Sequence, residues 1–510
     1  MPKIARARSE ENRRRIEAAA LELFTKQGFH GTNSREIAEK AGISTGAIYT
    51  YFTSKEAIYA GLAQKYSLHM DEWGRQTVGA LKNPLSKEDL KKLAYAIHSK
   101  MYEDPEFTLM LLSDVVEFRN QHFREVFHDM PARFRRLLGP VLEQTKRKPG
   151  WRGGDPAFAL AAVYIYFFVY ALAVRHMQGQ KAMGADYEQG IKWFVDLLSR
   201  GLWGSPKGLH SNSQKKSKNH SSRTRILQKD VNEWVDYIRF VCGRLWSSPP
   251  DGLPSHSPEN HGPNPVKRPI LFLPAIPKDR IDENQLRIEE AALELFTRQG
   301  FHGTNIRDIA EKAGVSQGAI YMYYPSKEAI FEGLVRSYRH CMARFLERVF
   351  RTLEDPFSRG DLKLLVAAIQ ASVYDDPEYW LLMYIDVIEF KNQHFASLFH
   401  DTPEQFRRLL GPAIDKVKQQ PGWCGLDPAL AMAIIYLYFS TYFTIEKLMH
   451  GDQHLGVSDD QASERLIDLF CSGLWDVRPG VSPRKSTHQP QKAPAPVRAT
   501  DEHGSSSPRA

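Results

Sequence analysis

Residues 35–55 carry side chains whose chemistry suits contacts with nucleic acid. Basic, small and hydroxyl-bearing residues occur together there: Arg35, Thr45, Gly46, Ala47, Tyr49, Tyr51 and Lys55. An arginine can pair with a guanine edge, and small residues at the start of a helix allow close approach to bases. Tyrosine hydroxyls and a lysine ammonium group can reach phosphate oxygens. These residues predict a DNA-binding surface, provided that the local fold presents them together.

The surrounding sequence predicts the helices that would do so. Residues 16–26 have apolar side chains at three- and four-residue steps, which is typical of an amphipathic helix. Asn33 can cap a second helix, with a glutamate three residues later as in a capping box. Gly42 then allows a tight turn, and Ser44 can cap a third helix over residues 45–51. This order predicts a helix-turn-helix whose last helix is built to enter a major groove.

The same segment occurs twice. Residues 16–62 return as residues 288–334, and 36 of the 47 aligned residues are identical without a gap. The same offset of 272 residues holds as far as the Gly-Leu-Trp segments at 201–203 and 473–475. A period this long indicates a duplicated domain rather than an array of small repeats. Helical corners are common, so one match would be weak evidence, and a full pattern that occurs twice strengthens the prediction.

Composition favours a soluble globular protein with two or more domains, since the 510 residues are 42% hydrophobic and 25% charged. The net charge of +8 lies outside the two similar halves: residues 204–275 carry eleven Lys/Arg against five Asp/Glu, and residues 476–510 carry six against three. The halves together are close to neutral. The basic balance is therefore no argument for nucleic-acid binding, which rests on local features.

The sequence offers no sign of an enzyme, a cofactor or a metal centre. We find no phosphate loop, nucleophile motif or metal-spaced cluster, and four repeated histidines make no metal set: His122, His128, His394 and His400. The four cysteines lie far apart without a CxxC pair, which fits a reducing cytoplasm. No apolar segment follows the N-terminal charges, so we expect no secretory signal and a cytoplasmic protein.

Two uncharged stretches, residues 156–174 and 428–445, are long enough to cross a membrane. They are rich in Tyr and Ala, and charged residues stand at their ends. A helix that is apolar all round is equally typical of the buried centre of a bundle or of an oligomer interface. We expect buried helices here and no membrane partner.

Apolar runs with helical spacing are separated by Gly and Pro, and no alternating strand pattern stands out, so the sequence predicts an all-α fold. In the first half we expect three helices up to residue 51, followed by helices over residues 55–73, 87–102, 107–120, 122–146, 157–176 and 187–202. The connector 204–275 and the tail 476–510 are polar and rich in Pro and Ser, and are predicted to be mostly disordered. Residues 231–246 could form one amphipathic helix within the connector.

These motifs resemble the N-terminal domain of the TetR/AcrR family of bacterial transcriptional regulators. The pattern A-x-x-L-F-x-x-x-G-F stands at residues 20–29, and I-A-E-K-A-G-I-S-x-G-A-I-Y-x-Y-F-x-S-K-E-A-I stands at residues 37–58. The resemblance implies helix-turn-helix DNA-binding domains at 1–55 and 276–327. It also implies helical ligand-binding and dimerisation domains at 56–203 and 328–475. The linker and the tail fall outside it.

The resemblance further implies a DNA operator and a small-molecule effector, because members are typically homodimers that leave DNA when a small molecule binds. By motif position the implied DNA contacts are Arg35, Thr45, Gly46, Ala47, Tyr49, Thr50, Tyr51, Lys55, Arg307, Gln317, Gly318, Ala319, Tyr321, Met322, Tyr323 and Lys327. Residues implied beside the ligand pocket are Phe107, Met110, Glu117, Asn120, His122, Tyr379, Glu389, Asn392 and His394. Apolar walls with few polar groups suit a lipophilic effector.

The chain departs from the family pattern by holding two such units, and the copies differ where bases would be contacted. Thr45 aligns with Gln317 and Thr50 with Met322, and of these only glutamine can pair bidentately with adenine. We therefore predict a repressor that binds an imperfect palindrome with unlike half-sites. The alternative is a ligand-binding or interaction protein in which one helix-turn-helix no longer contacts DNA.

The 72-residue connector allows the two copies to pair within one chain. As a flexible coil it would span roughly 45 Å, whereas half-sites one helical turn apart are separated by about 34–36 Å. An intrachain pseudo-dimer is our first expectation. A homodimer carrying four helix-turn-helix units is the rival arrangement.

Overall fold

The computed structural model describes residues 3–152, 154–176, 187–202, 283–396, 402–449 and 454–474. Every regular element in these ranges is an α-helix, which confirms the predicted all-α class. The predicted linker with its possible helix at residues 231–246, and the predicted tail, lie outside the described residues. We call residues 3–202 the first unit and residues 283–474 the second unit.

The helices follow the same order in both units. The first unit contains α1 (Lys3–Gln27), α2 (Ser34–Ala41), α3 (Thr45–Tyr51), α4 (Lys55–Gly79), α5 (Lys87–Glu103), α6 (Pro105–Phe118), α7 (Arg124–Phe127), α8 (Met130–Lys146), α9 (Pro156–His176) and α11 (Tyr187–Leu202). The second unit contains α13 (Glu283–Gln299), α14 (Ile306–Ala313), α15 (Gln317–Tyr323), α16 (Lys327–Thr352), α17 (Arg359–Tyr374), α18 (Pro377–Glu389), α19 (Thr402–Leu410), α20 (Pro412–Gln419), α21 (Pro428–Leu448) and α22 (Asp459–Leu474).

Three predicted helices have the wrong bounds. Helix α1 begins at Lys3, well before the predicted start at residue 16. Helix α4 continues to Gly79, beyond the predicted end at residue 73. The prediction of a single helix over residues 122–146 is wrong, because the helix is interrupted between α7 and α8. Asp129 adopts a left-handed backbone with φ of 38°, and its carboxylate accepts the N–H of Ala132 to cap α8. A capping aspartate with a proline in the first turn, Pro131, is typical of a helix start, which the apolar periodicity alone did not indicate.

The predicted turn chemistry of the helix-turn-helix is confirmed in the first unit. Asn33 and Glu36 form the reciprocal capping box at the start of α2. Gly42 ends α2 in the left-handed conformation with φ of 66°, and the Ser44 hydroxyl accepts the N–H of Ala47 at the start of α3. The second unit repeats the turn, except that the Asn305 amide donates to the Asp308 side chain instead of closing a box.

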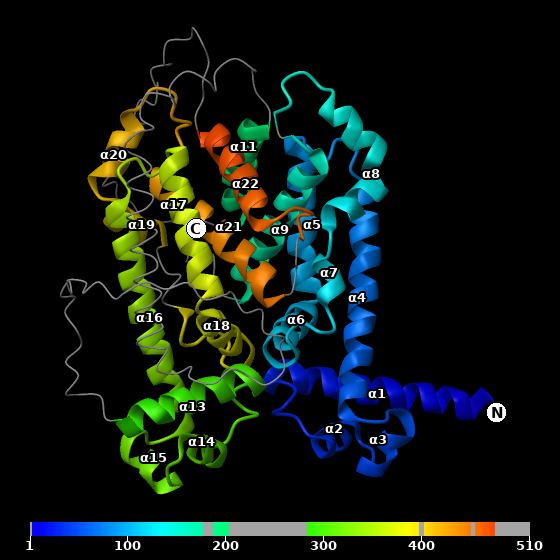
Figure 1. Ribbon diagram of the computed structural model, residues 1–510. Coiled ribbons are helices and arrows are strands. Elements are labelled where there is room, and N and C mark those ends of the chain that lie inside the picture. The colour runs from blue at the N-terminus through cyan, green and yellow to red at the C-terminus, as the bar shows by residue number, and fades with distance from the viewer. Residues whose placement is uncertain are drawn as a thin grey trace, which may run out of the picture.

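Figure 1 shows the two units side by side, with α1–α3 and α13–α15 at one end and the longer helices standing above them. Two of those longer helices, α9 and α21, are long and apolar enough to cross a membrane. In the fold, 94% of the most apolar window of α9 and 83% of that of α21 are buried. Their apolar surface is therefore covered by protein, as expected for core helices.

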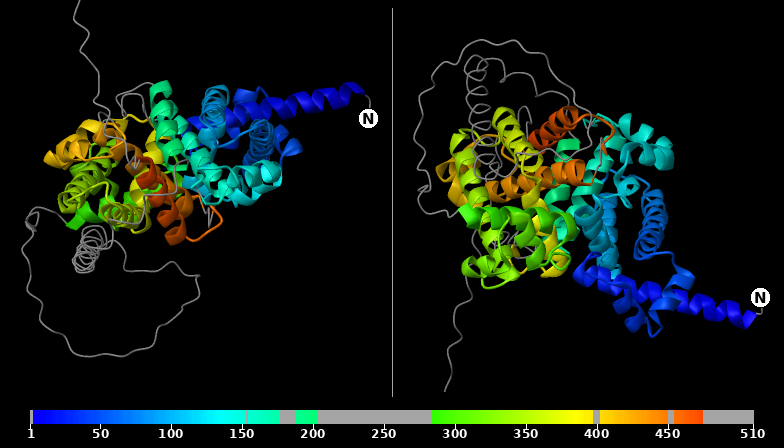
Figure 2. Two further views of the ribbon diagram at one scale, coloured as in Figure 1. Left: turned by 90° about the horizontal axis from the view of Figure 1, so that it is seen from above. Right: turned by 60° about the horizontal axis from the view of Figure 1, so that its bottom comes forward.

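The two units pack through the last turns of α11 and α22, which lie between the units, toward the end opposite the short helices (Figure 1). A β-carbon added to Gly201 would stand 2.3 Å from the carbonyl oxygen of Leu469, and one added to Gly473 would stand 2.3 Å from that of Leu197. The glycines thus allow a backbone-to-backbone approach that any side chain would prevent. The units also stay side by side in the two views of Figure 2, where the N-terminal end of α1 extends away from the rest of the molecule.

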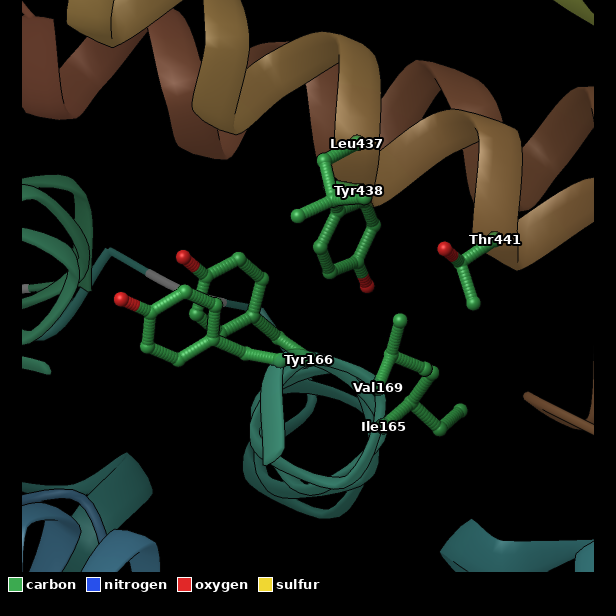
Figure 3. Close-up of a pocket in the computed structure, with 7 residues that line it drawn as sticks. Ile165, Tyr166, Val169, Leu437, Tyr438 and Thr441 are labelled. Carbon is green, nitrogen blue, oxygen red and sulfur yellow. The ribbon is translucent and has the colours of Figure 1, made fainter. Parts of the chain in front are cut away.

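Helices α9 and α21 meet at a second contact between the units. Figure 3 shows side chains of α9 facing Tyr438 and its neighbours on α21. The Tyr438 hydroxyl donates to the carbonyl of Ala162 at 3.3 Å, and its ring stacks on that of Tyr166. The space among these residues admits no water molecule, so the contact is closed packing rather than a ligand cavity.

The segment after α21 reaches across to the first unit. The side-chain amide of Asn120 donates to the carbonyl of Met449, and the backbone N–H of Met130 donates to the carbonyl of His454 at 3.1 Å. His454 is fully buried, and its Nδ1 atom contacts the carboxylate of Glu446 within the second unit. These bonds add polar contacts to the apolar packing of the two units.

Candidate nucleic-acid interface

The residues expected to contact DNA lie on α2, α3 and the start of α4, and on α14, α15 and the start of α16. Ten of the sixteen are exposed: Arg35, Thr45, Gly46, Tyr49, Thr50, Arg307, Gln317, Gly318, Tyr321 and Met322. The other six are half-buried: Ala47, Tyr51, Lys55, Ala319, Tyr323 and Lys327. Helices α3 and α15 lie at the same end of the molecule, so one partner could contact both (Figure 1).

The outer face of each short helix presents large side chains to solvent. Tyr49 is 54% exposed, Tyr321 is 55% exposed and Met322 is 85% exposed. Methionine is usually buried, so its exposure here leaves an apolar group available to a partner. In a major groove such a group can pack against a thymine methyl.

The hydroxyl groups of the two tyrosines of α3 differ in the hydrogen bonds that they make within the protein. The Tyr51 hydroxyl accepts a hydrogen bond from the Asn12 side chain at 2.9 Å, which ties α3 to α1. The Tyr49 hydroxyl donates a long hydrogen bond of 3.5 Å to Ser34. Tyr49 is thus the better placed of the two for an outside contact.

Lys55 is held inside the first unit. Its ammonium group donates to the carbonyls of Phe29 and Thr32 at 2.7 and 2.6 Å and lies 4.0 Å from the centre of the Phe29 ring. Burial lowers the pKa of Lys55, and the nearby carboxylate of Glu117 opposes that shift. Lys327 makes the same bonds in the second unit, to Phe301 and Thr304. Each lysine therefore links the turn after the first helix of its unit, α1 or α13, to the helix that follows the helix-turn-helix, α4 or α16.

In each unit, a carboxylate from the helices that follow the helix-turn-helix accepts backbone N–H groups of this same turn. Glu117, near the end of α6, accepts the backbone N–H groups of Phe29 and His30, both at 2.7 Å. Burial raises the pKa of Glu117 to about 7, although these bonds favour the charged form. Gly28 makes room for the carboxylate, since its β-carbon would lie 2.8 Å from Oε1. Sequence reasoning missed this joint because its two sides are 88 residues apart.

The second unit repeats the joint through Glu389, which accepts the N–H groups of Phe301 and His302 at 2.8 and 2.6 Å. Burial raises the pKa of Glu389 to about 8, and the negative charge of Glu117 adds to the shift. The two turns also meet directly, because a β-carbon on Gly31 would lie 2.7 Å from the β-carbon of His302. The two joints are therefore neighbours across the boundary between the units.

An aromatic cluster surrounds each joint. In the first unit the Phe118 ring lies 4.7 Å from that of Phe29 and 4.8 Å from that of His122. His122 is fixed by Asp114, which bonds both its backbone N–H and its Nδ1 atom. Phe390 and His394 repeat these contacts in the second unit. The cluster connects the end of α6 to the helix-turn-helix by direct packing.

A cavity of about 880 Å³ opens in the first unit, between α4 and α6–α9. Its lining is mostly apolar, with Phe127, Phe134 and Phe168 among its walls, and it includes His122 of the aromatic cluster. The volume falls within the range of small-molecule sites. A molecule in this cavity would contact a residue that packs toward the helix-turn-helix.

The residues expected beside a ligand pocket separate into two groups. Phe107 and His122 line the cavity. The Met110 carbonyl accepts the Tyr59 hydroxyl, Glu117 forms the joint, and Asn120 bonds to the second unit. Their second-unit counterparts occupy matching places: Tyr379 is buried in the core, Glu389 forms the joint, Asn392 has a left-handed backbone, and His394 bonds to Asp386.

Several cavity-lining residues were not predicted, notably Ala60, Ser67, Gly74 and Val78 on α4. The sequence feature that could have indicated them is a series of small residues spaced by seven and four positions. This spacing places them on one face of a helix. Within the described ranges no group of three or more His, Cys, Asp or Glu side chains is arranged to hold a metal ion.

Comparison with known proteins matches each unit to one protein class. The family model of bacterial regulatory proteins, tetR family, matches residues 16–62 and 288–334. The fatty acid metabolism regulator protein of Bacillus subtilis (strain 168) is 33% identical over 191 residues, covering 37% of this chain and 94% of that protein. The uncharacterized HTH-type transcriptional regulator YfiR of the same organism is 26% identical over 204 residues, covering 38% and 94%.

Among solved structures, a TetR family transcription regulator from Marinobacter aquaeolei VT8 is similar at 16% sequence identity with a TM-score of 0.31, covering 39% of this chain and 99% of that one.

Proposed function

Because the chain belongs to the TetR family of bacterial regulatory proteins, which bind DNA operators, we propose that it acts as a single-chain pseudo-dimer. In this proposal α3 and α15 enter two successive major grooves of one operator. The observation that carries it is the joining of two complete units through α11, α22, α9 and α21, with both short helices at one end (Figure 1). A family homodimer would supply the same pair of helices from two chains.

Each exposed residue has a role in this proposal. Thr45, Gly46 and their copies Gln317 and Gly318 stand at the helix starts, where base edges are reached. Tyr49 and Tyr321 contact phosphates, and Arg35 and Arg307 contact a base edge or a phosphate. Lys55 and Lys327 act through the turn that they fasten, since their ammonium groups already bond to carbonyls.

The two half-sites of the operator would differ in sequence. Gln317 and Met322 replace Thr45 and Thr50 on the exposed face of the second short helix. Glutamine suits adenine, and an exposed methionine suits a thymine methyl. The operator is therefore an imperfect palindrome.

We further propose that the chain is a cytoplasmic repressor released by a small lipophilic effector. The mostly apolar cavity and the aromatic cluster beside it support this proposal. A relative that is 33% identical is described as a fatty acid metabolism regulator, which agrees with a lipophilic ligand. A ligand that moves His122 or Phe118 would disturb the turn held by Glu117.

Selection of bound sequences from a random DNA pool, followed by alanine substitution, tests this function. Tyr49→Ala and Tyr321→Ala should each weaken binding to the selected site at least tenfold. Footprints of the variants should each lose protection over a different half-site. If Tyr321→Ala leaves affinity and footprint unchanged, the second helix-turn-helix does not contact DNA, and the pseudo-dimer proposal fails.

A further inference from the structure

Nine residues of α4 line the cavity in the first unit, and four of them are small: Ala60, Ser67, Gly74 and Val78. Steps of seven and four residues place them along one face of the helix. A β-carbon on Gly74 would meet no atom of the described residues within 4 Å, so this position leaves space open. The Ser67 hydroxyl is buried and has no hydrogen-bond partner among the residues that the structure describes. This face of α4 therefore offers both room and one unused polar group.

The second unit carries a larger residue at each of these four positions: Glu332, Arg339, Leu346 and Phe350. Phe350 is buried, and its ring lies 5.0 Å from that of Phe406, which in turn packs on Tyr436. Leu346 packs against the same hydrophobic core. Side chains of α16 thus occupy the space that Gly74 and Val78 leave open in α4.

In the second unit, the positions that correspond to Ser67 and Ala60 also carry side chains that make contacts. The Arg339 guanidinium donates to the backbone carbonyl of His394 at 3.4 Å, and Glu332 lies 3.7 Å from the His394 ring. The corresponding residues of the first unit, Ser67 and Ala60, are too short to make these contacts. His394 is therefore covered by its own unit, whereas His122 faces the cavity.

We propose that the chain binds one effector molecule, in the first unit alone, and that this effector is an amphipathic anion. The inference rests on the proposed function and specifies its ligand. The second unit then acts as a fixed partner that supplies a helix-turn-helix without sensing the ligand. Release of one half-site would suffice to weaken a pseudo-dimer, because both halves bind through a single chain.

The charge of the ligand follows from the lining. The lining includes three arginines and two acidic residues: Arg75, Arg133, Arg136, Asp71 and Glu125. Asp71 already pairs with Arg75 at 3.1 Å and with Arg133. Arg136 is exposed and has no hydrogen bond or ion pair with any residue in the described part of the chain. A guanidinium beside apolar walls suits a carboxylate on an apolar tail.

The test is a titration of the full chain, without DNA, with the fluorescent fatty acid cis-parinaric acid, and native mass spectrometry of the mixture. We expect one bound molecule per chain. Displacement by decanoate should need at least tenfold less ligand than displacement by decanol. Two molecules per chain, no binding, or equal displacement by the alcohol would overturn the proposal.

The double variant Gly74→Leu with Val78→Phe copies the second unit into the first and should weaken probe binding at least tenfold. Gly61→Leu is the matched control, because Gly61 lies on the same helix and its β-carbon would also meet nothing within 4 Å, yet it does not line the cavity. The control should bind normally, and undiminished binding by the double variant would contradict the proposal. The probe count on the unmodified chain decides the matter if the double variant misfolds. Operator binding is measured separately, so failure of the regulator proposal would show in a chain that binds the probe but no DNA.

Discussion

The backbone N–H of His30 donates to the carboxylate of Glu117 at 2.7 Å. A side chain of α6 therefore binds the turn between α1 and α2, within the helix-turn-helix domain. In the first unit this bond joins the helix-turn-helix to α6, one of the helices around the cavity. It is repeated by Glu389 and His302 at 2.6 Å. The aromatic cluster around His122 makes a second route across the same boundary.

The joint predicts a pH dependence of stability. Burial raises the pKa of Glu117 to about 7 and that of Glu389 to about 8, whereas an unfolded glutamate titrates near 4.5. The folded state thus holds more protons than the unfolded state between pH 4.5 and 8. Their contribution to stability is complete below about pH 4.5 and is lost as pH rises through 7 and 8.

The double variant Glu117→Gln with Glu389→Gln should therefore show a smaller fall in thermal unfolding temperature between pH 5 and 8 than the unmodified chain. At pH 5 the variant should be less stable, because the glutamine amide replaces one of the two accepting oxygens with an NH2 donor that would face a backbone N–H group. Unfolding curves at matched ionic strength measure both effects. An equal fall in both proteins would show that these carboxylates do not titrate in this range.

Lys55→Ala should lower the stability of the first helix-turn-helix by about 2–4 kcal/mol, because two charge-assisted bonds to carbonyls are lost. Lys40→Ala is the control, since Lys40 makes a surface ion pair with Glu22, and its removal should cost less than about 1 kcal/mol. Hydrogen exchange at amides of residues 29–41 reports both. Unchanged exchange combined with weaker DNA binding would instead make Lys55 a phosphate contact.

Exchange of the differing residues should equalise the half-sites. With Thr45→Gln and Thr50→Met, the first short helix gains the exposed residues of the second. The sequences selected from a random pool should then become more nearly palindromic, because the same side chains meet both halves. A consensus that keeps its asymmetry would indicate that other residues, such as those of the extended α1, choose the bases.

The contact between the units depends on two glycines. Gly201→Ala and Gly473→Ala should each destabilise the chain by about 1–3 kcal/mol, because the new β-carbon would overlap a carbonyl of the facing helix. Gly139→Ala is the control: its β-carbon would meet no atom of the described part of the chain within 4 Å, and alanine favours a helix. Chemical unfolding compares the three. A neutral outcome for both interface variants would argue against this packing in solution.

Local features of the motif were predictable from sequence because they depend on neighbours. Asn33, Gly42 and Ser44 act within a few residues, and their spacing specified the caps and the turn. The apolar helices near residues 156 and 428 were also recognisable, since helices of that composition need to be covered.

Long-range contacts were not predictable in the same way. A glutamate after an apolar run resembles a solvent-exposed helix end, and nothing near Glu117 indicates that it binds a turn 88 residues earlier. The role of Lys55 was hidden likewise, because its carbonyl partners belong to a distant turn. Comparison of Gly74 and Val78 with Leu346 and Phe350 does carry a signal, and it becomes interpretable once the cavity is located.

In the proposed function, one chain occupies one operator through two unlike helix-turn-helix motifs. Native mass spectrometry of the purified chain with its selected duplex tests this most directly. We predict a complex of one 58.3 kDa chain with one duplex, at concentrations where the free chain is monomeric. A complex that contains two chains per duplex, with no single-chain species along the titration, would contradict the account.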